Sequence, residues 1–121
     1  MSDNFTTDNF QSILEAIQLI EERFVEVSQA GDFVLSPHGV IILDSIAMRL
    51  QVIGELVKKI EKSDRSLLDK YSNIKWDLII RLRDIISHHY AVIDHEIIYD
   101  ICKNHIPPLK ASVLKILEKT L

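Results

Sequence analysis

Eight consecutive residues in the second half of the chain combine the side chains that phosphate chemistry requires. The run from Arg83 to Tyr90 reads Arg-Asp-Ile-Ile-Ser-His-His-Tyr and lies in an otherwise apolar stretch. A buried arginine is costly unless it is paired, so polar groups in such a setting are expected to have a function. Arg83 is a permanent cation, and His88 can carry a proton near neutral pH. The pair predicts a site that handles a phosphate group, and Asp84 could orient either member.

Helix geometry limits how these side chains can meet. On an ideal helix Arg83 and Tyr90 share one face about 10 Å apart, whereas His88 lies about 140° around the axis from Arg83. Arg83 and His88 therefore meet only if the arginine bends across, the helix unwinds, or a second subunit contributes. A composite site at a dimer interface, with two copies of the motif facing each other, satisfies this condition.

The histidines are less suited to binding a metal. Adjacent histidines, as at His88 and His89, point to different faces, and neither cysteine partners nor a His-x3-His spacing accompanies them. We expect no metal and no cofactor. Cys102 is the only cysteine, which excludes an intrachain disulfide, and its position in an apolar segment favours packing over reactivity.

The composition is that of a compact protein outside the membrane. A chain of 121 residues suits a single domain, and 47% hydrophobic residues exclude a disordered one. No apolar stretch approaches the roughly 18 residues that a membrane span needs. The N-terminus lacks a basic region followed by an apolar core, so we expect no secretory signal and a cytoplasmic protein.

The charge is unevenly distributed. The net charge of -4 argues against a general nucleic-acid binder, but residues 1–48 carry one basic and eight acidic side chains (-7). Residues 49–83 carry nine basic and five acidic side chains (+4), and residues 84–121 carry four and five (-1). The basic residues of the middle segment form either a solvated helix face or a surface that steers polyanions: Lys58, Lys59, Lys62, Arg65, Lys70 and Lys75.

Apolar residues at helical spacing, with three glycines and three prolines between them, predict an all-α fold. The pattern indicates an antiparallel bundle of four to five helices, with enough apolar residues to favour a dimer. The first expected helix begins after Thr6-Thr7-Asp8 and ends at Gly31-Asp32, and the second runs from Ser36-Pro37 to about Glu61. The third is one long helix that runs from Asn73-Trp76 into the motif. The last begins at a cap formed by Asp94.

Specific residues are expected in the core or at breaks. Pro107-Pro108 should kink the last helix, because each proline removes an amide donor, before helical spacing resumes at residues 109–117. Gly54 could permit a close helix approach, and Trp76 is expected in the core. The inward positions are Phe10, Ile13, Leu14, Ile17, Phe24 and Val27 in the first helix, Val40, Leu43, Ala47, Leu50, Ile53, Val57 and Ile60 in the second, and Ile79, Leu82 and Ile86 in the third.

The motif and its surroundings resemble a known family. Arg83, His88 and Tyr90 match the Arg-x4-His-x-Tyr signature of HEPN domains, specifically of the HepT-like branch. Residues 50–58 (Leu-Gln-Val-Ile-Gly-Glu-Leu-Val-Lys) look like its Ile-Gly-Glu helix, 71–76 like its Tyr-Pro-x-Ile-x-Trp entry, and 98–101 with 106–109 like its closing helix. Ser72 stands where the family commonly has proline. The resemblance covers residues 1–121 as one HEPN-like domain and is most specific over 40–117.

The resemblance implies a function and a set of partners. It implies a homodimeric toxin that cleaves RNA, such as tRNA or mRNA, without a metal, and that is paired with a MntA-type minimal nucleotidyltransferase antitoxin. Arg83 and His88 would be catalytic, with Asp84 in support, and Tyr90 would receive AMP from the antitoxin. Two other interpretations stay open: a non-catalytic nucleotide- or substrate-binding partner of a nucleotidyltransferase, and an inert structural bundle.

Overall fold

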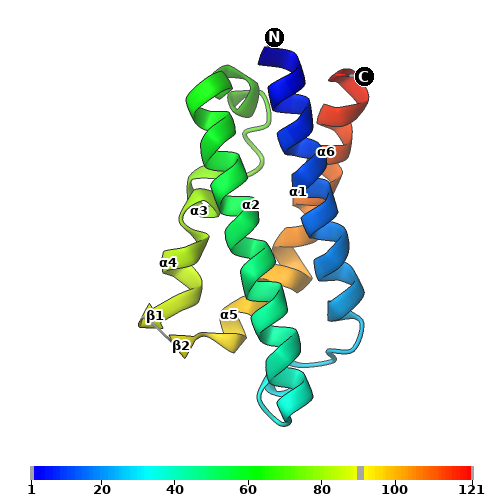
Figure 1. The fold of residues 1–121 in the computed structure, drawn as a ribbon, viewed down its shortest axis with the longest axis vertical. Helices are drawn as coiled ribbons and strands as arrows, with labels where there is room; N and C mark the ends of the chain where they lie inside the picture. The colour runs from blue at the N-terminus through cyan, green and yellow to red at the C-terminus, as the bar shows by residue number, and fades with distance from the viewer. Residues whose placement is uncertain (1, 90–91, 121) are drawn as a thin grey trace.

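The computed structural model describes residues 2–89 and 92–120, and within them the side chains other than those of residues 2, 3, 88, 89 and 120. Figure 1 shows an antiparallel helical bundle in which successive long helical segments run alternately down and up. The predicted all-α class is therefore confirmed. The elements are α1 (Ser2–Phe24), a 3₁₀ turn η1 (Ala30–Phe33), α2 (Pro37–Asp69), α3 (Trp76–Ile80), α4 (Leu82–Ile86), β1 (Ser87–His89), β2 (Val92–Ile93), α5 (His95–Asp100), a π-helical turn η2 (Ile101–His105) and α6 (Ile106–Thr120).

The first helix has the predicted core face but different ends. Phe10, Ile13 and Ile17 are fully buried. The helix begins at Ser2, so the predicted cap near Thr6 is wrong, and Thr6 is instead a buried position within the helix. It ends at Phe24, well before the predicted glycine stop. Packing against α2 and α6 along its whole length supports these ends, and the local capping signal at residues 6–8 is overridden.

The second helix confirms its predicted start. The Gly39 amide donates to Ser36 Oγ at 3.0 Å, and Pro37 occupies the first helical position. The helix extends eight residues past the predicted end at Glu61, with one non-helical residue at Asp64. Six of its seven predicted inward residues are buried, whereas Val40 is 41% exposed, so that assignment is wrong.

The predicted long third helix is wrong, because the structure has two short helices and a hairpin there. Arg81 (φ -96°, ψ 15°) separates α3 from α4, and the chain becomes extended at Ser87. In one continuous helix, Trp76 and Leu82 would lie about 120° apart around the axis. The break lets both enter the core, where Trp76 Nε1 donates to the Leu68 and Tyr71 carbonyls at 3.0 and 3.1 Å.

The last helical segment stays helical through the predicted break. The residue before Pro107, Ile106, has helical angles (φ -66°, ψ -44°), so the prolines do not push it to an extended conformation. Instead, the wider π-helical turn η2 lies directly before them, and the Ile106 amide donates to the Ile101 carbonyl. The α6 helix then continues to Thr120, which confirms the resumed helical spacing.

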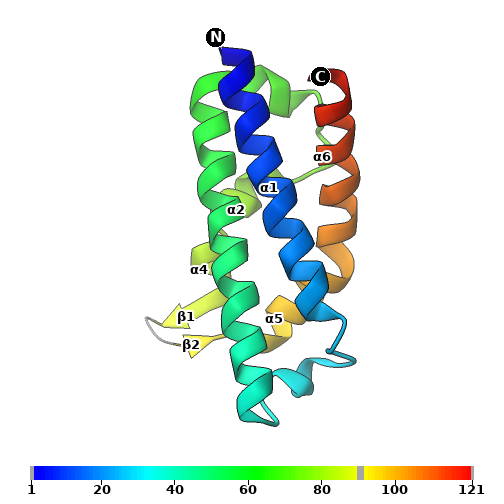
Figure 2. The same ribbon diagram turned by 45° about the vertical axis from the view of Figure 1, so that its right-hand side comes forward.

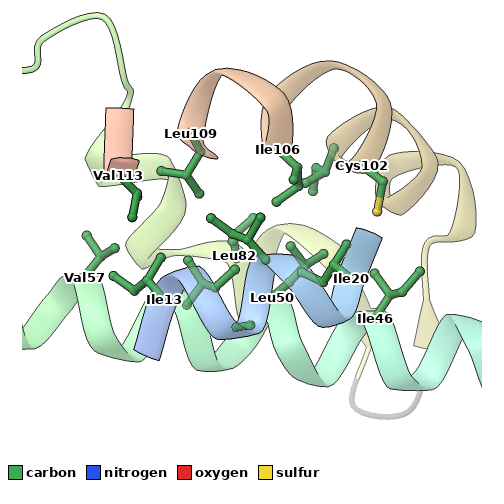
Figure 3. Packing of buried hydrophobic residues seen from close by; sticks show 14 of the residues in the cluster. Ile13, Ile20, Ile46, Leu50, Val57, Leu82, Cys102, Ile106, Leu109 and Val113 are labelled. Atoms are coloured by element: carbon green, nitrogen blue, oxygen red, sulfur yellow. The ribbon is translucent and has the colours of Figure 1, made fainter. Parts of the chain in front are cut away.

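A single cluster of buried apolar side chains joins these segments. Figure 3 shows Leu82 of α4 among Leu50 of α2 and Ile106 and Leu109 of α6. Trp76, Ile86 and Cys102 belong to the same cluster. Within the part of the chain that the structure describes, no helix is long and apolar enough to cross a membrane.

A close approach between helices occurs at Gly54, as predicted. A Cβ atom added there would lie 2.7 Å from the Ile79 carbonyl oxygen, a backbone atom of α3. Real Cβ atoms essentially never approach a neighbour so closely, so α3 can sit at this depth only over a glycine.

Replacing this glycine should destabilise the fold. Gly54→Ala forces the backbones apart, at a cost of about 1–3 kcal/mol, which exceeds the intrinsic helical advantage of alanine of roughly 1 kcal/mol. Urea unfolding followed by circular dichroism measures the difference. Gly31→Ala is the control, because nothing lies within 4 Å of its added Cβ. Equal unfolding midpoints for the two variants would contradict the close approach.

Candidate active site

The α4 helix holds the motif's arginine at the surface. Leu82 and Ile86, four residues apart, are buried and anchor one face of α4 in the core. Arg83 and Asp84 lie on the opposite face and are exposed. The guanidinium of Arg83 forms no ion pair with any side chain that the structure describes. It is therefore available to an anion arriving from solvent.

A short antiparallel hairpin follows α4 and carries His88. Ser87 pairs with Ile93 and His89 with Val92, with an irregular register between these pairs. The Asp94 amide donates to the Ile86 carbonyl at 2.8 Å and closes the base of the hairpin. Figures 1 and 2 show the hairpin projecting from the bundle beside α2.

The α5 helix anchors the end of the hairpin where the chain leaves β2. The predicted cap is confirmed, because the Asp94 carboxylate accepts from the Glu96 and Ile97 amides at 3.0 and 3.1 Å. Further along α5, the Tyr99 hydroxyl donates to the Ser28 carbonyl at 3.0 Å, and its ring packs against Phe24 at 5.5 Å. These contacts tie the exit of the hairpin to the α1–α2 connection.

The predicted site residues fall on different elements. Arg83 and Asp84 are in α4, and the backbone of His88 is in β1, while its side chain lies outside the described part. Tyr90 also lies outside the described residues. Because the helix ends at Ile86, the expected helical face shared by Arg83 and Tyr90 is wrong. The helix thus unwinds before His88. Unwinding is one of the three conditions under which Arg83 and His88 can meet.

Other chemically capable side chains outside the motif have structural roles or settings of their own. Burial raises the pKa of the Cys102 thiol to about 12, which keeps it protonated and confirms its packing role. His105 lies 3.3 Å from Asp100 in an exposed pair, and Glu55 is exposed on α2. Among the described side chains, no group of three or more His, Cys, Asp or Glu could hold a metal ion.

An exposed apolar surface on α2 was not singled out from the sequence. Ile41 and Met48 of α2 are 65% and 53% exposed, and Val52 on the same face is half-buried. Val92 in β2 is 52% exposed. The seven- and four-residue spacings within α2 are visible in the sequence, but only the packed structure shows that no described element covers this face. We call Ile41, Met48 and Val52 the α2 stripe.

The fold and motif define a class of protein. An all-α antiparallel bundle with an Arg-x4-His-x-Tyr motif at the end of its third helical segment is a HEPN-type domain. The chain belongs to the HepT-like ribonuclease family, since the family model described as "Ribonuclease HepT-like" matches residues 13–116.

Individual relatives agree with this membership. A "Putative RNase" from Caldanaerobacter subterraneus subsp. tengcongensis is 31% identical over 109 residues, which cover 90% of this chain and 91% of the relative. A "Probable ribonuclease HepT" from Thermococcus cleftensis is 30% identical over 109 residues, covering 90% and 93%.

A longer relative matches over only part of its length. A "Gamma-glutamylcyclotransferase and putative RNase" from Methanocaldococcus jannaschii is 34% identical over 107 residues, which are 88% of this chain but 45% of that protein. The chain thus spans less than half of this relative. No solved structure gives a significant match.

The cap at the hairpin exit should contribute measurably to stability. Asp94→Ala removes the acceptor for two α5 amides and should lower the free energy of unfolding by about 1 kcal/mol. Asp94→Asn should retain most of that stability, because asparagine caps helices about as well as aspartate. Chemical denaturation of the three proteins tests this. Equal losses of unfolding free energy in both variants would show that the negative charge of Asp94, and not its capping hydrogen bonds, stabilises the fold.

Proposed function

We propose that this protein is a metal-independent RNA endonuclease, acting as a homodimer and as the toxin of a toxin-antitoxin pair. The observation that carries the proposal is an exposed, unpaired Arg83 on the helix that leads directly into the strand containing His88, in a chain of the HepT-like ribonuclease family. The names of two relatives that match this chain along nearly their whole length also describe RNases.

The chemistry assigns one role to each residue of the pair. His88 takes the proton of an RNA 2'-hydroxyl as that oxygen attacks the neighbouring phosphorus, since histidine is the side chain that most often performs such proton transfers. Arg83 stabilises the negative charge that builds on the phosphoryl oxygens. The bond from phosphorus to the 5'-oxygen breaks, and the leaving oxygen takes a proton. The products are a 2',3'-cyclic phosphate and a 5'-hydroxyl.

A dimer supplies both proton-transfer groups. With one motif histidine per chain, the His88 of one subunit acts as base and that of the other protonates the leaving oxygen. The α2 stripe supports this arrangement, because it is an exposed apolar surface on the helix beside which the hairpin projects. Burying it against a second copy removes apolar area from water.

Tyr90 provides the regulatory point. In the proposal a nucleotidyltransferase antitoxin transfers AMP from ATP to its phenol oxygen: the oxygen loses its proton, bonds to the α-phosphorus, and pyrophosphate leaves. The added phosphate then lies near Arg83 and occupies the cation that RNA needs, while its charge repels the RNA backbone. The modified toxin is inactive for electrostatic and steric reasons, without unfolding.

Cleavage assays test the nuclease directly. Purified protein, confirmed by mass to be free of AMP, is incubated with total tRNA and with a mixed mRNA pool in excess EDTA. Arg83→Ala and His88→Ala should each lower the rate by about 100-fold or more while remaining folded. His105→Ala, an exposed histidine far from the motif in sequence, should cut like the wild type. A wild type that cuts neither RNA would favour the non-catalytic partner of a nucleotidyltransferase.

Disrupting the α2 stripe tests the dimer. Met48→Glu places a charge where the proposed interface excludes water, so it should convert the dimer to monomer in analytical ultracentrifugation and reduce cleavage. Leu114→Glu is the matched control, since Leu114 is 46% exposed on α6. A Met48→Glu protein that stays dimeric and active would place the interface elsewhere.

A further inference from the structure

An open cavity of about 510 Å³ lies beside α3, between the end of α2 and the connection that follows it. We call it the α3 cavity. Leu78, which is 40% exposed, supplies an apolar part of its wall. Its wall also carries three cations, Arg65, Lys75 and Arg81, and three carboxylates, Glu61, Asp69 and Asp77.

The α3 cavity carries equal numbers of cations and carboxylates, but two of its three cations are available to bind an anion. Arg65 lies 3.1 Å from Glu61, so these two charges neutralise each other. Lys75 and Arg81 are exposed and form no ion pair with any residue in the described ranges. Two cations are therefore free to bind anions at the cavity mouth, and Asp69 and Asp77 are the charges that oppose this.

The surface leading to the α3 cavity is basic. Lys58 and Lys62 are four residues apart, so they share one face of α2, and both are exposed. Lys70, at the end of that helix, is exposed as well. The excess of positive charge in residues 49–83 thus continues from the cavity along the second half of α2.

The α3 cavity adjoins the proposed catalytic arginine. Arg81 precedes Arg83 by two residues, so their Cα atoms are no more than about 7.6 Å apart. In Figure 1, α3 and α4 lie on one side of α2, while α1 lies on the other. The exposed side chains of α1 include an acidic series at seven-residue spacing: Asp8, Glu15 and Glu22. A polyanion is repelled from the α1 side and attracted to the α3 side.

We propose that the α3 cavity is a second RNA subsite, where Lys75 and Arg81 hold phosphates of nucleotides next to the cleaved bond. This inference rests on the proposed nuclease function and adds to it the path that the substrate takes from Arg83 over α3 toward α2. Leu78 provides apolar contact for a ribose or base. Because phosphate contacts position RNA without reading its bases, this subsite increases affinity with little sequence preference.

Binding measurements test the subsite independently of cleavage. The probe is a fluorescein-labelled 12-nucleotide single-stranded RNA, titrated by fluorescence anisotropy with full-length protein carrying His88→Ala to prevent cutting. Adding Lys75→Gln and Arg81→Gln should weaken binding. The slope of log affinity against log salt concentration should become shallower by about 1.4, since each phosphate contact on a single strand contributes about 0.7.

Two further variants distinguish a local subsite from overall charge. Lys115→Gln removes one exposed cation from α6 and should leave affinity and slope close to those of the parent. Asp77→Asn removes a carboxylate from the cavity wall and should tighten binding. If the Lys75→Gln and Arg81→Gln protein binds RNA like the Lys115→Gln protein, the subsite is wrong.

The results also separate this inference from the nuclease proposal. Wild-type cleavage combined with RNA binding that is indifferent to Lys75 and Arg81 overturns the subsite alone. Weaker binding on loss of these two cations, in a protein whose wild type cuts no RNA, supports the subsite and overturns the nuclease. Circular dichroism of each variant verifies that the fold is retained.

Discussion

The contact between the α2 and α3 backbones at Gly54 is the constraint on which the site depends. With the Ile79 carbonyl held against a residue that has no side chain, α3 lies deep on α2. From that depth the chain must break at Arg81 to bury Leu82 and Ile86 as well as Trp76. The break fixes the orientation of α4, which in turn directs Arg83 to solvent and starts the hairpin that contains His88.

The resulting surface separates three kinds of chemistry around one motif. Exposed apolar side chains lie on α2, unpaired cations lie beside α3, and exposed carboxylates lie on α1. This separation suits a protein that pairs with its own copy and accepts a polyanion on one side. It also gives a chain with a net charge of -4 the local excess of cations that the proposed RNA subsite requires.

Local sequence signals predicted the features that local physics controls. Ser36 and Asp94 were predicted as caps and are caps, because a side-chain oxygen bonds to amides only two or three residues away. The buried stripes of α1 and α2 followed from helical spacing. The third segment was mispredicted as one helix, since its apolar residues fit a helical period and nothing local marks Arg81 as a break.

By itself, the sequence determined the all-α class, most of the core residues, and the motif that places the chain in the HepT-like ribonuclease family. These depend on residue type and spacing, which are local properties. Only the tertiary structure decided where α4 begins, that His88 sits on a strand, that Val40 stays exposed, and that Lys75 and Arg81 share a cavity with the end of α2. Each of these depends on which backbone segments can approach each other, and that is settled only when the core is packed.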